Sequence, residues 1–149
     1  VLFLDLDRFK PVNDEFGHDV GDRLLTAVAE RLSSCTRAGD VVARLGGDEF
    51  AVLIDGHRTP DEGERLGARL IQAFVDPFQI DRHRLALTAS VGQSVYPTDA
   101  DSAETLLRTA DLSMFQHKRR GGPSHPRSRS PEDGVGSPGV DSAAADPHR

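Results

Sequence analysis

The sequence contains a single cysteine, a single methionine and no tryptophan. Because Cys35 has no second cysteine to pair with, no internal disulfide is possible, and a reducing cytoplasmic setting is expected. No apolar run approaches the roughly 20 residues that a membrane-spanning helix needs. Residues 1–4 are apolar but run straight into acidic residues without a basic region before them, so they do not resemble a signal peptide. We therefore expect a cytoplasmic domain with no membrane segment in this chain, although a longer parent protein could be membrane-anchored.

The chain also lacks an excess of positive charge. Its formal net charge is -6 and its pI is near 5.4. An acidic chain without a concentrated basic patch argues against binding to duplex nucleic acid, which depends on neutralising phosphates. A phosphate-bearing ligand stays open, because metal ions can bridge carboxylates to phosphates. Acidic clusters are therefore the first features to examine.

Large apolar residues become scarce near Gly121. From there to residue 149 the sequence is dominated by Pro, Gly, Ser, Asp and Arg. Such a composition cannot bury enough surface to offset its ordering entropy, so residues 121–149 are predicted to be disordered. One folded domain is expected over residues 1–120.

Hydrophobic periodicity predicts alternating strands and helices within that domain. The helix over 19–35 places Val20, Leu24 and Val28 on one face. The helix over 103–118 is expected to bury Leu106, Leu107, Ala110, Met114 and Phe115. Together the predicted elements are a strand 1–6, a polar loop 7–19, a helix 19–35, strands 41–45 and 50–54, a helix 61–74, strands 78–80 and 85–96, and a helix 103–118. This order predicts an α/β protein of the α+β type, with one mainly antiparallel sheet covered by helices.

Acidic residues gather at two points of this predicted sheet. Asp5 and Asp7 close the first strand, and Asp48 and Glu49 lie at the turn between the strands that flank Gly46-Gly47. Residues two apart in a strand project to the same face, and pairing of the hairpin with the first strand would bring Asp48 close to Asp5. Clustered carboxylates are costly without a cation between them, and hard oxygen ligands select Mg²⁺. For Asp5 and Asp7 taken alone, solvated acids at a strand end are the simpler interpretation.

The segment over residues 7–19 joins this strand to the next helix and carries Lys10 and Asn13. Segments of this kind can hold phosphates through oriented backbone amides. Asn13 and Asp22 offer groups that match the edge of guanine, because a carboxylate can accept from its N1–H and its exocyclic amine. The residue chemistry therefore indicates a metal-dependent nucleotide site.

An ordered set of motifs resembles the GGDEF domain of bacterial diguanylate cyclases. The likeness covers roughly residues 1–120, and the ordered set is far more specific than any single motif. The motifs are Leu4-Asp5-Leu6-Asp7-Arg8-Phe9-Lys10, Asn13-Asp14, Phe16-Gly17-His18, Gly21-Asp22, Gly46-Gly47-Asp48-Glu49-Phe50, Ser90-Val91-Gly92 and Ala110-Asp111 with Lys118. The resemblance implies the ferredoxin-like, palm-type nucleotidyl cyclase fold and the condensation of two GTP molecules into cyclic di-GMP and two pyrophosphates.

The resemblance also implies the metal ligands. Asp5 and Asp48 would hold Mg²⁺ or Mn²⁺ through their side chains, assisted by the carbonyl of Leu6. Glu49 would lie beside the metals, as a ligand or as the group that eases deprotonation of the attacking 3′-hydroxyl. Two metals would stabilise the entering and leaving oxygens of an in-line displacement.

The implied nucleotide contacts are Asn13 and Asp22 on guanine, and Lys10 and Lys118 on the triphosphate. Each subunit would hold one GTP, so turnover is expected to require a homodimer with its two domains face to face.

Arg37-Ala38-Gly39-Asp40 resembles the Arg-x-x-Asp inhibitory site of the family, at which cyclic di-GMP binds and restrains the enzyme. Arginine suits phosphate and aspartate suits guanine, and Arg69 is a further expected contact. The simpler alternative for Arg37 and Asp40 is an ion pair at the end of a helix.

Three departures bear on activity. The family's preceding helix, with a Leu-Thr-Gly-Leu-like segment, is absent from this sequence; Gly121-Gly122 replaces the usual Gly-Arg; and the tail shows no last edge strand. Turnover is therefore expected more readily from a longer parent protein. The alternative is a binding module that senses GTP or cyclic di-GMP without turnover. A palm domain that uses ATP is disfavoured by Asp22.

Overall fold

The computed structural model describes residues 1–56 and 61–119. The predicted disordered tail over 121–149 lies outside these ranges. Among the described helices, none is both long and apolar enough to cross a membrane.

Four strands form the central sheet. β1 (Leu2–Asp7) lies between β3 (Glu49–Leu53) and β6 (Thr88–Gln93), and β2 (Val41–Gly46) pairs with the outer side of β3. All three strand pairs are antiparallel, and the spatial order is β2-β3-β1-β6. The predicted antiparallel sheet is thereby confirmed, and its order is that of a ferredoxin-like fold.

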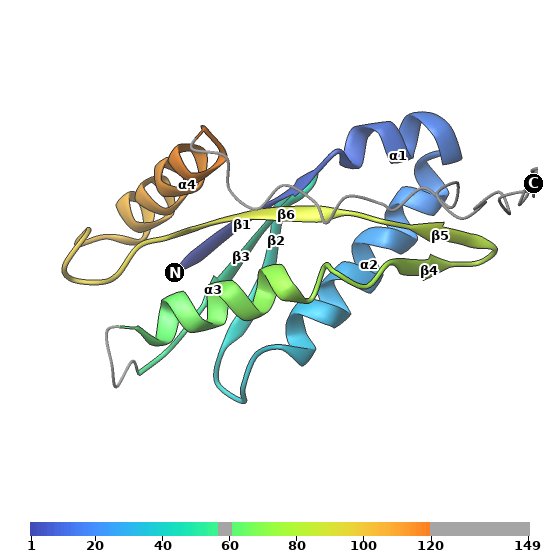
Figure 1. Cartoon of the computed structure of the whole chain (residues 1–149). Helices are drawn as coiled ribbons and strands as arrows, with labels where there is room; N and C mark the ends of the chain where they lie inside the picture. Colours follow the sequence, from blue (N-terminus) through green and yellow to red (C-terminus); the bar gives the residue numbers. More distant parts are fainter. Residues whose placement is uncertain (57–60, 120–149) are drawn as a thin grey trace, which may run out of the picture.

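Helices α2 (His18–Ser34) and α3 (Glu62–Gln72) cover one face of this sheet (Figure 1). Successive side chains of a strand point to opposite faces, so Leu2, Leu4 and Leu6 all point toward these helices. They are at most 1% exposed and form the main core together with apolar residues of α2 and α3. The helical periodicity read from the sequence is therefore confirmed for both helices.

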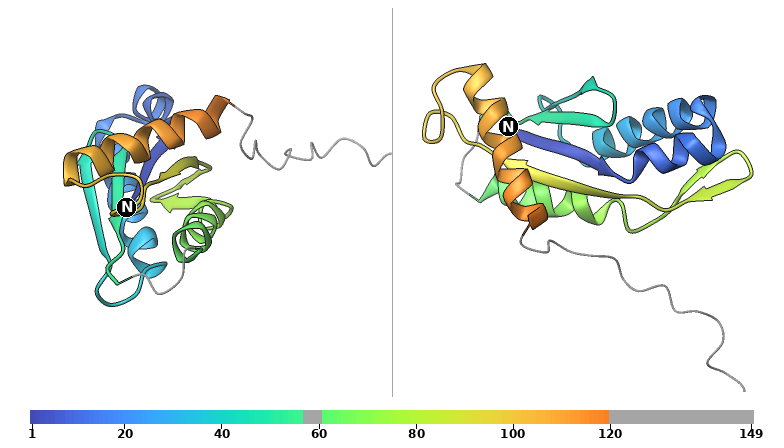
Figure 2. Two further views of the ribbon diagram at one scale, coloured as in Figure 1. Left: turned by 90° about the vertical axis from the view of Figure 1, so that its left-hand side faces the viewer. Right: turned by 90° about the horizontal axis from the view of Figure 1, so that it is seen from above.

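Helix α4 (Ala103–Arg119) covers the opposite face (Figure 2). Phe3 points to this side and packs with Ala110 and Met114 in a smaller cluster. Gly92 of β6 lies directly beneath the helix, where a Cβ atom would come within 2.0 Å of the Ala110 carbonyl oxygen. The prediction that Phe115 is buried is wrong: it is 55% exposed, because the narrow contact with the sheet is made by the turn that carries Ala110 and Met114.

The prediction of a polar loop over residues 7–19 is also wrong, because most of this segment forms helix α1 (Phe9–Phe16). Arg8 precedes the helix in the left-handed region, with φ 66°, and redirects the chain as it leaves β1. Pro11 is tolerated because it lies in the first turn, where backbone N–H groups have no partner within the helix. Phe9 is buried and anchors the helix against the core.

The strand predicted over 85–96 is two strands. β5 (His83–Leu85) pairs with β4 (Phe78–Ile80) in a separate hairpin, and only Thr88–Gln93 joins the central sheet. The hairpin extends toward α1 and α2 (Figure 1), and the ring of His83 lies 4.8 Å from that of Phe16.

Arg31 of α2 ties the segment before this hairpin to the domain. Its guanidinium donates to the carbonyl oxygens of Ala73, Asp76 and Pro77 and lies 3.5 Å from the centre of the Phe78 ring. Burial lowers the pKa of Arg31, which the charge of Asp76 partly opposes.

Candidate nucleotide and metal site

The residues predicted to bind metal occupy adjacent backbone positions at one end of the central sheet. Asp5 lies opposite Glu49 in the β1–β3 ladder, and the next amide, Leu6 N–H, donates to the Asp48 carbonyl oxygen at 3.1 Å. In a strand the N–H and C=O of one residue point to the same side, so the Leu6 carbonyl also faces the β2–β3 turn. The backbone positions of the four residues predicted to bind metal are therefore neighbours at the end of β1.

The β2–β3 turn leaves its backbone accessible to a ligand. Gly46 pairs with Glu49, which leaves Gly47 and Asp48 as the two turn residues. Gly47 has φ +51°, a conformation that favours glycine, and its carbonyl accepts from Arg44 Nε at 2.9 Å. No heavy atom lies within 4 Å of a Cβ built on either glycine, so the backbone here is open to a ligand.

Lys118, from the last turn of α4, lies against the acids of β1. Its Nζ is 2.6 Å from Asp5 Oδ1 and 3.1 Å from Asp7 Oδ1. Partial burial acts to lower the pKa of Lys118, but the hydrogen bonds and charges of Asp5 and Asp7 outweigh it and raise the pKa above its ordinary value. Lys118 was predicted to contact a triphosphate, and the structure places its ammonium group between two carboxylates at the end of β1.

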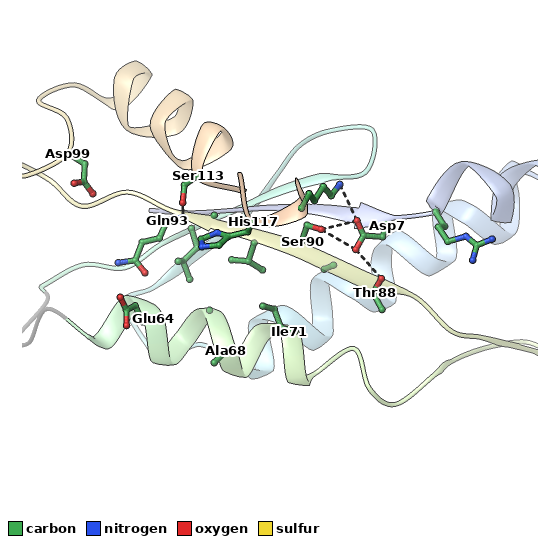
Figure 3. A pocket seen from close by; sticks show the side chains of 17 residues that line it. Asp7, Glu64, Ala68, Ile71, Thr88, Ser90, Gln93, Asp99, Ser113 and His117 are labelled. Carbon is green, nitrogen blue, oxygen red and sulfur yellow. Dashed lines mark hydrogen bonds and ion pairs between the residues drawn. The ribbon is translucent and has the colours of Figure 1, made fainter. Parts of the chain in front are cut away.

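Asp7 is held by two hydroxyl groups of β6, an arrangement that the sequence analysis missed. The Thr88 hydroxyl donates to Oδ2 at 3.0 Å and the Ser90 hydroxyl donates to Oδ1 at 2.9 Å (Figure 3). The signal that could have revealed these contacts is the two-residue alternation of Thr88 and Ser90, which matches that of Asp5 and Asp7. Confirming it required the β1–β6 register, which sets Asp7 opposite Thr88 and Asp5 opposite Ser90.

The donor set suits magnesium or manganese. Within residues 1–56 and 61–119, no three His, Cys, Asp or Glu side chains converge as a preformed metal-ligand group. Mg²⁺ does not require one, because it usually takes one or two protein carboxylates and completes its shell with water and phosphate oxygens. Asp5, Asp48 and the Leu6 carbonyl offer hard oxygen atoms, and Asp5 already forms an ion pair with the Lys118 ammonium group.

Asn13 lies where α1 packs against α2. Its Oδ1 is buried without a hydrogen-bond partner, and a Cβ on Gly21 would come within 1.8 Å of that oxygen. Because Asp22 follows Gly21 on α2, the two residues predicted to read guanine lie on neighbouring helices. A buried amide oxygen without a hydrogen-bond partner carries a free-energy cost. Lys10 is exposed in the first turn of α1, close to the end of β1.

A cavity of about 1000 Å³ lies between α3, β6 and the C-terminal turns of α4 (Figure 3). Asp7 and Lys118 are among the residues that line it, whereas Asn13 and Asp48 are not. The cavity therefore overlaps the candidate site only at its edge. The acids at the end of β1 define the candidate site instead, because carboxylates are the groups that a metal–nucleotide complex requires.

Arg37 and Asp40 lie together after α2. The backbone N–H of Arg37 donates to Asp40 Oδ2 at 3.1 Å, and Arg37 Nε lies 3.5 Å from Asp40 Oδ1. The Asp40 side chain is only 3% exposed, and the Arg37 guanidinium also reaches Glu62 at 3.6 Å. Arg69 is exposed on α3, seven residues or about 10 Å along the helix from Glu62. The structure thus brings Arg37 and Asp40 together and places Arg69 farther along α3.

A four-stranded ferredoxin-like sheet, with acids at the end of its first strand and in the adjacent hairpin turn, defines a palm-type nucleotidyl cyclase fold. A family model described as "Diguanylate cyclase, GGDEF domain" matches residues 1–124. The chain belongs to this family.

Named relatives share this domain within longer proteins. MucR of Pseudomonas aeruginosa, a bifunctional diguanylate cyclase/cyclic di-GMP phosphodiesterase, is 46% identical over 121 residues, which cover 81% of this chain and 18% of MucR. The cyclic di-GMP phosphodiesterase NbdA, from the same organism, is 50% identical over 81% of this chain and 15% of NbdA. The diguanylate cyclase TpbB, also from P. aeruginosa, is 39% identical over 80% of this chain and 28% of TpbB. The chain thus spans less than a third of each relative.

Solved structures show the same fold. The GGDEF domain of TpbB superposes with a TM-score of 0.77 at 37% identity, covering 82% of this chain and 77% of that one. An EAL/GGDEF domain protein from M. capsulatus gives 0.76 at 42% identity, covering 80% and 77%. The GGDEF domain of DgcB from Caulobacter crescentus, solved in complex with c-di-GMP, gives 0.63 at 26% identity, covering 80% and 71%.

Proposed function

We propose that this domain is a diguanylate cyclase that condenses two GTP molecules into cyclic di-GMP and two pyrophosphates, using Mg²⁺ or Mn²⁺. The observation that supports the proposal is the adjacency, along the β1–β3 ladder, of the backbone positions of Asp5, Leu6, Asp48 and Glu49. Family membership alone does not set the reaction, because the relatives named above include one called a phosphodiesterase.

Each group has a defined task in this reaction. Asn13 and Asp22 orient guanine, and Lys10 and Lys118 neutralise the triphosphate. Glu49 favours loss of the proton from the attacking 3′-hydroxyl. The 3′-oxygen of one GTP forms a bond to the α-phosphorus of the other, the bond between that phosphorus and the bridging oxygen breaks, and pyrophosphate leaves. The same exchange in the opposite direction closes the ring.

Metal held by Asp5, Asp48 and the Leu6 carbonyl would supply Lewis-acid stabilisation of charge on the entering and leaving oxygens. The protein's share is to fix these ligands. Pairing of β1 with β3 sets the positions of Asp5 and the Leu6 carbonyl, and the Gly47 turn sets that of Asp48.

The test is incubation of this chain, and of any longer chain that contains it, with GTP and Mg²⁺, followed by chromatographic detection of cyclic di-GMP and pyrophosphate. Asp48→Ala is expected to lower turnover at least about 100-fold, since loss of metal-assisted charge stabilisation costs several kcal/mol. Asp101→Ala, which removes an exposed acid from the loop before α4, is the matched control and should retain activity. Near-normal turnover by Asp48→Ala would contradict the metal assignment. GTP binding without product, in a dimeric preparation, would favour the sensor alternative.

We further propose that cyclic di-GMP inhibits the enzyme through Arg37 and Asp40. The support is the exposed Arg37 guanidinium, a group that suits phosphate, which the nearly buried Asp40 carboxylate holds in place. The ion-pair alternative describes the same contacts, so only a functional measurement separates the two interpretations.

Arg37→Ala is expected to weaken inhibition by added cyclic di-GMP about tenfold or more, the loss typical of one charge-assisted hydrogen bond. Arg84→Ala, an exposed arginine of β5, should leave inhibition unchanged. Equal inhibition of Arg37→Ala and the unmodified chain would remove the regulatory assignment.

A further inference from the structure

Asp5 and Asp7 share one ammonium group. Because residues two apart on a strand project to the same face, both carboxylates of β1 point toward the end of α4. Lys118 Nζ lies 2.6 Å from Asp5 Oδ1 and 3.1 Å from Asp7 Oδ1. Two neighbouring carboxylates repel each other unless a cation lies with them, so Lys118 performs here the task that a metal would perform at Asp5.

The two carboxylates are held very differently. Both oxygens of Asp7 already accept hydrogen bonds, from the hydroxyl groups of Thr88 and Ser90. For Asp5, the hydrogen bond made to its carboxylate within the described part of the chain comes from Lys118. Asp7 is therefore fixed to β6 whatever Lys118 does, whereas Asp5 is free to exchange Lys118 for another cation.

We propose that Lys118 is a built-in counter-ion of Asp5 that a divalent metal displaces, and that Asp7 is a positioning residue which keeps the released ammonium group beside the site. This inference rests on the proposed function, because it takes Asp5 as a metal ligand. In the metal-free domain Lys118 bridges both acids. When metal takes Asp5, Lys118 keeps its contact with Asp7 and turns its other donors toward a nucleotide phosphate.

The exchange links the two ligands thermodynamically. Metal binding without nucleotide has to break the Asp5–Lys118 contact, and a bound triphosphate offers the displaced ammonium group a new acceptor. Each ligand therefore lowers the cost of binding the other, which is positive coupling and is necessarily reciprocal. Removal of the Lys118 charge should strengthen metal binding in the absence of nucleotide and weaken nucleotide binding in the presence of metal.

The first experiment titrates Mn²⁺ into the full 149-residue chain without nucleotide, by calorimetry or by electron paramagnetic resonance of free Mn²⁺. Lys118→Met is expected to tighten binding about three- to tenfold, the effect of removing a charge-assisted hydrogen bond between side chains that are 35% and 25% exposed. Arg119→Met is the matched control, because it changes the net charge equally at the next position, where the guanidinium lies over Phe115. It should change Mn²⁺ affinity less than twofold.

The outcomes separate the two proposals. Absence of Mn²⁺ binding to the unmodified chain, or unaltered binding by Asp5→Asn, would overturn the metal assignment of the proposed function. Mn²⁺ binding by the unmodified chain that Lys118→Met does not tighten, or that Arg119→Met tightens equally, would overturn the counter-ion role alone.

The second experiment measures binding of a non-hydrolysable GTP analogue at saturating Mn²⁺. Asp7→Asn and Lys118→Met are each expected to weaken binding, and the double variant should be no weaker than Lys118→Met, because Asp7 acts through Lys118. Ser90→Ala provides a milder loosening of Asp7 should Asp7→Asn fail to fold, as judged by circular dichroism. Additive losses would overturn the positioning role of Asp7, since independent structural damage does not depend on whether Lys118 is present.

Discussion

At the scale of single residues, Gly21 and Asn13 face each other across the contact between α1 and α2. A Cβ at position 21 would lie 1.8 Å from Asn13 Oδ1, so Gly21→Ala has to push the amide out of its position. The same change removes a glycine from a helix interior, which stabilises a helix by up to about 1 kcal/mol. The new Cβ would also lie 3.3 Å from Cζ of the buried Phe9, so the helical gain offsets only part of the cost of the displacement. We therefore expect Gly21→Ala to lower affinity for GTP about tenfold or more with a small change in the free energy of unfolding.

Gly67→Ala is the control for this prediction. Gly67 lies within α3, and a Cβ there would make only ordinary contacts, at 3.8 Å to Val91 and 3.9 Å to Leu2. It should gain the same helical stability without loss of GTP affinity. Urea unfolding and calorimetric titration of both variants would decide the question. Retained GTP affinity in Gly21→Ala would show that the Asn13 amide does not read the nucleotide.

The sequence could predict individual site residues but not their partners. Asp5, Asp48 and Asn13 were identified because their residue types and spacing match a metal-dependent nucleotide site. The ion pairs of Lys118 with Asp5 and Asp7 could not be predicted from the sequence, because these residues are more than 100 positions apart. Their contact depends on the register of β1 with β6 and on the packing of α4 against the sheet. The role of Asp7 was therefore left open until its hydroxyl partners were known.

At the scale of elements, α4 is positioned by the glycine beneath it. A Cβ on Gly92 would lie 2.0 Å from the Ala110 carbonyl oxygen and 2.2 Å from the Met114 nitrogen. Both are backbone atoms of a helix and cannot move by a change of rotamer, so Gly92→Ala has to increase the distance between α4 and the sheet. Overpacking of this kind typically costs about 1–3 kcal/mol. Urea unfolding should show that loss.

Displacement of α4 should also change the candidate site, because Lys118 lies in the last turn of this helix. Metal-free Gly92→Ala is thus expected to show weaker contact between Lys118 and the β1 acids, observed as a shift of the lysine side-chain resonance in nuclear magnetic resonance. Gly67→Ala serves again as the control and should not lower stability. An equally stable Gly92→Ala variant would mean that the contact between α4 and β6 relaxes without cost.

The elements that periodicity identified are those with a continuous apolar face. α2, α3 and α4 were predicted for this reason, and the strands around Gly46-Gly47 were predicted from their apolar runs. α1 was missed because Pro11 and its polar neighbours read as a loop, while its stability comes from burial of Phe9 against distant core residues. The break between β5 and β6 was missed because the run over 85–96 stays mostly apolar, and only strand pairing shows that it belongs to two sheets.

At the scale of the whole molecule, the proposed product, cyclic di-GMP, has two equivalent halves, and the described part of the chain carries one set of the residues proposed to bind and join them. Residues 1–56 and 61–119 contain one Asn13–Asp22 pair, which is proposed to bind guanine, and one group of acids at the end of β1. Two identical bonds formed in opposite directions call for two sites related by a two-fold axis, which is the symmetry of an isologous dimer.

Turnover should therefore depend on association of two chains. At concentrations well below the dissociation constant of the dimer, the amount of dimer varies with the square of total protein, so tenfold dilution is expected to lower the rate of cyclic di-GMP formation about 100-fold. Addition of Asp48→Ala chain at a concentration above the dissociation constant of the dimer should lower the rate further, because it draws the unmodified chains into mixed dimers that hold only one complete set of metal ligands. Excess Asp101→Ala chain should raise the rate instead, since it supplies a competent partner. A rate that stays strictly proportional to enzyme concentration and is insensitive to the Asp48→Ala chain would mean that a single domain completes the reaction, and the face-to-face arrangement would have to be abandoned.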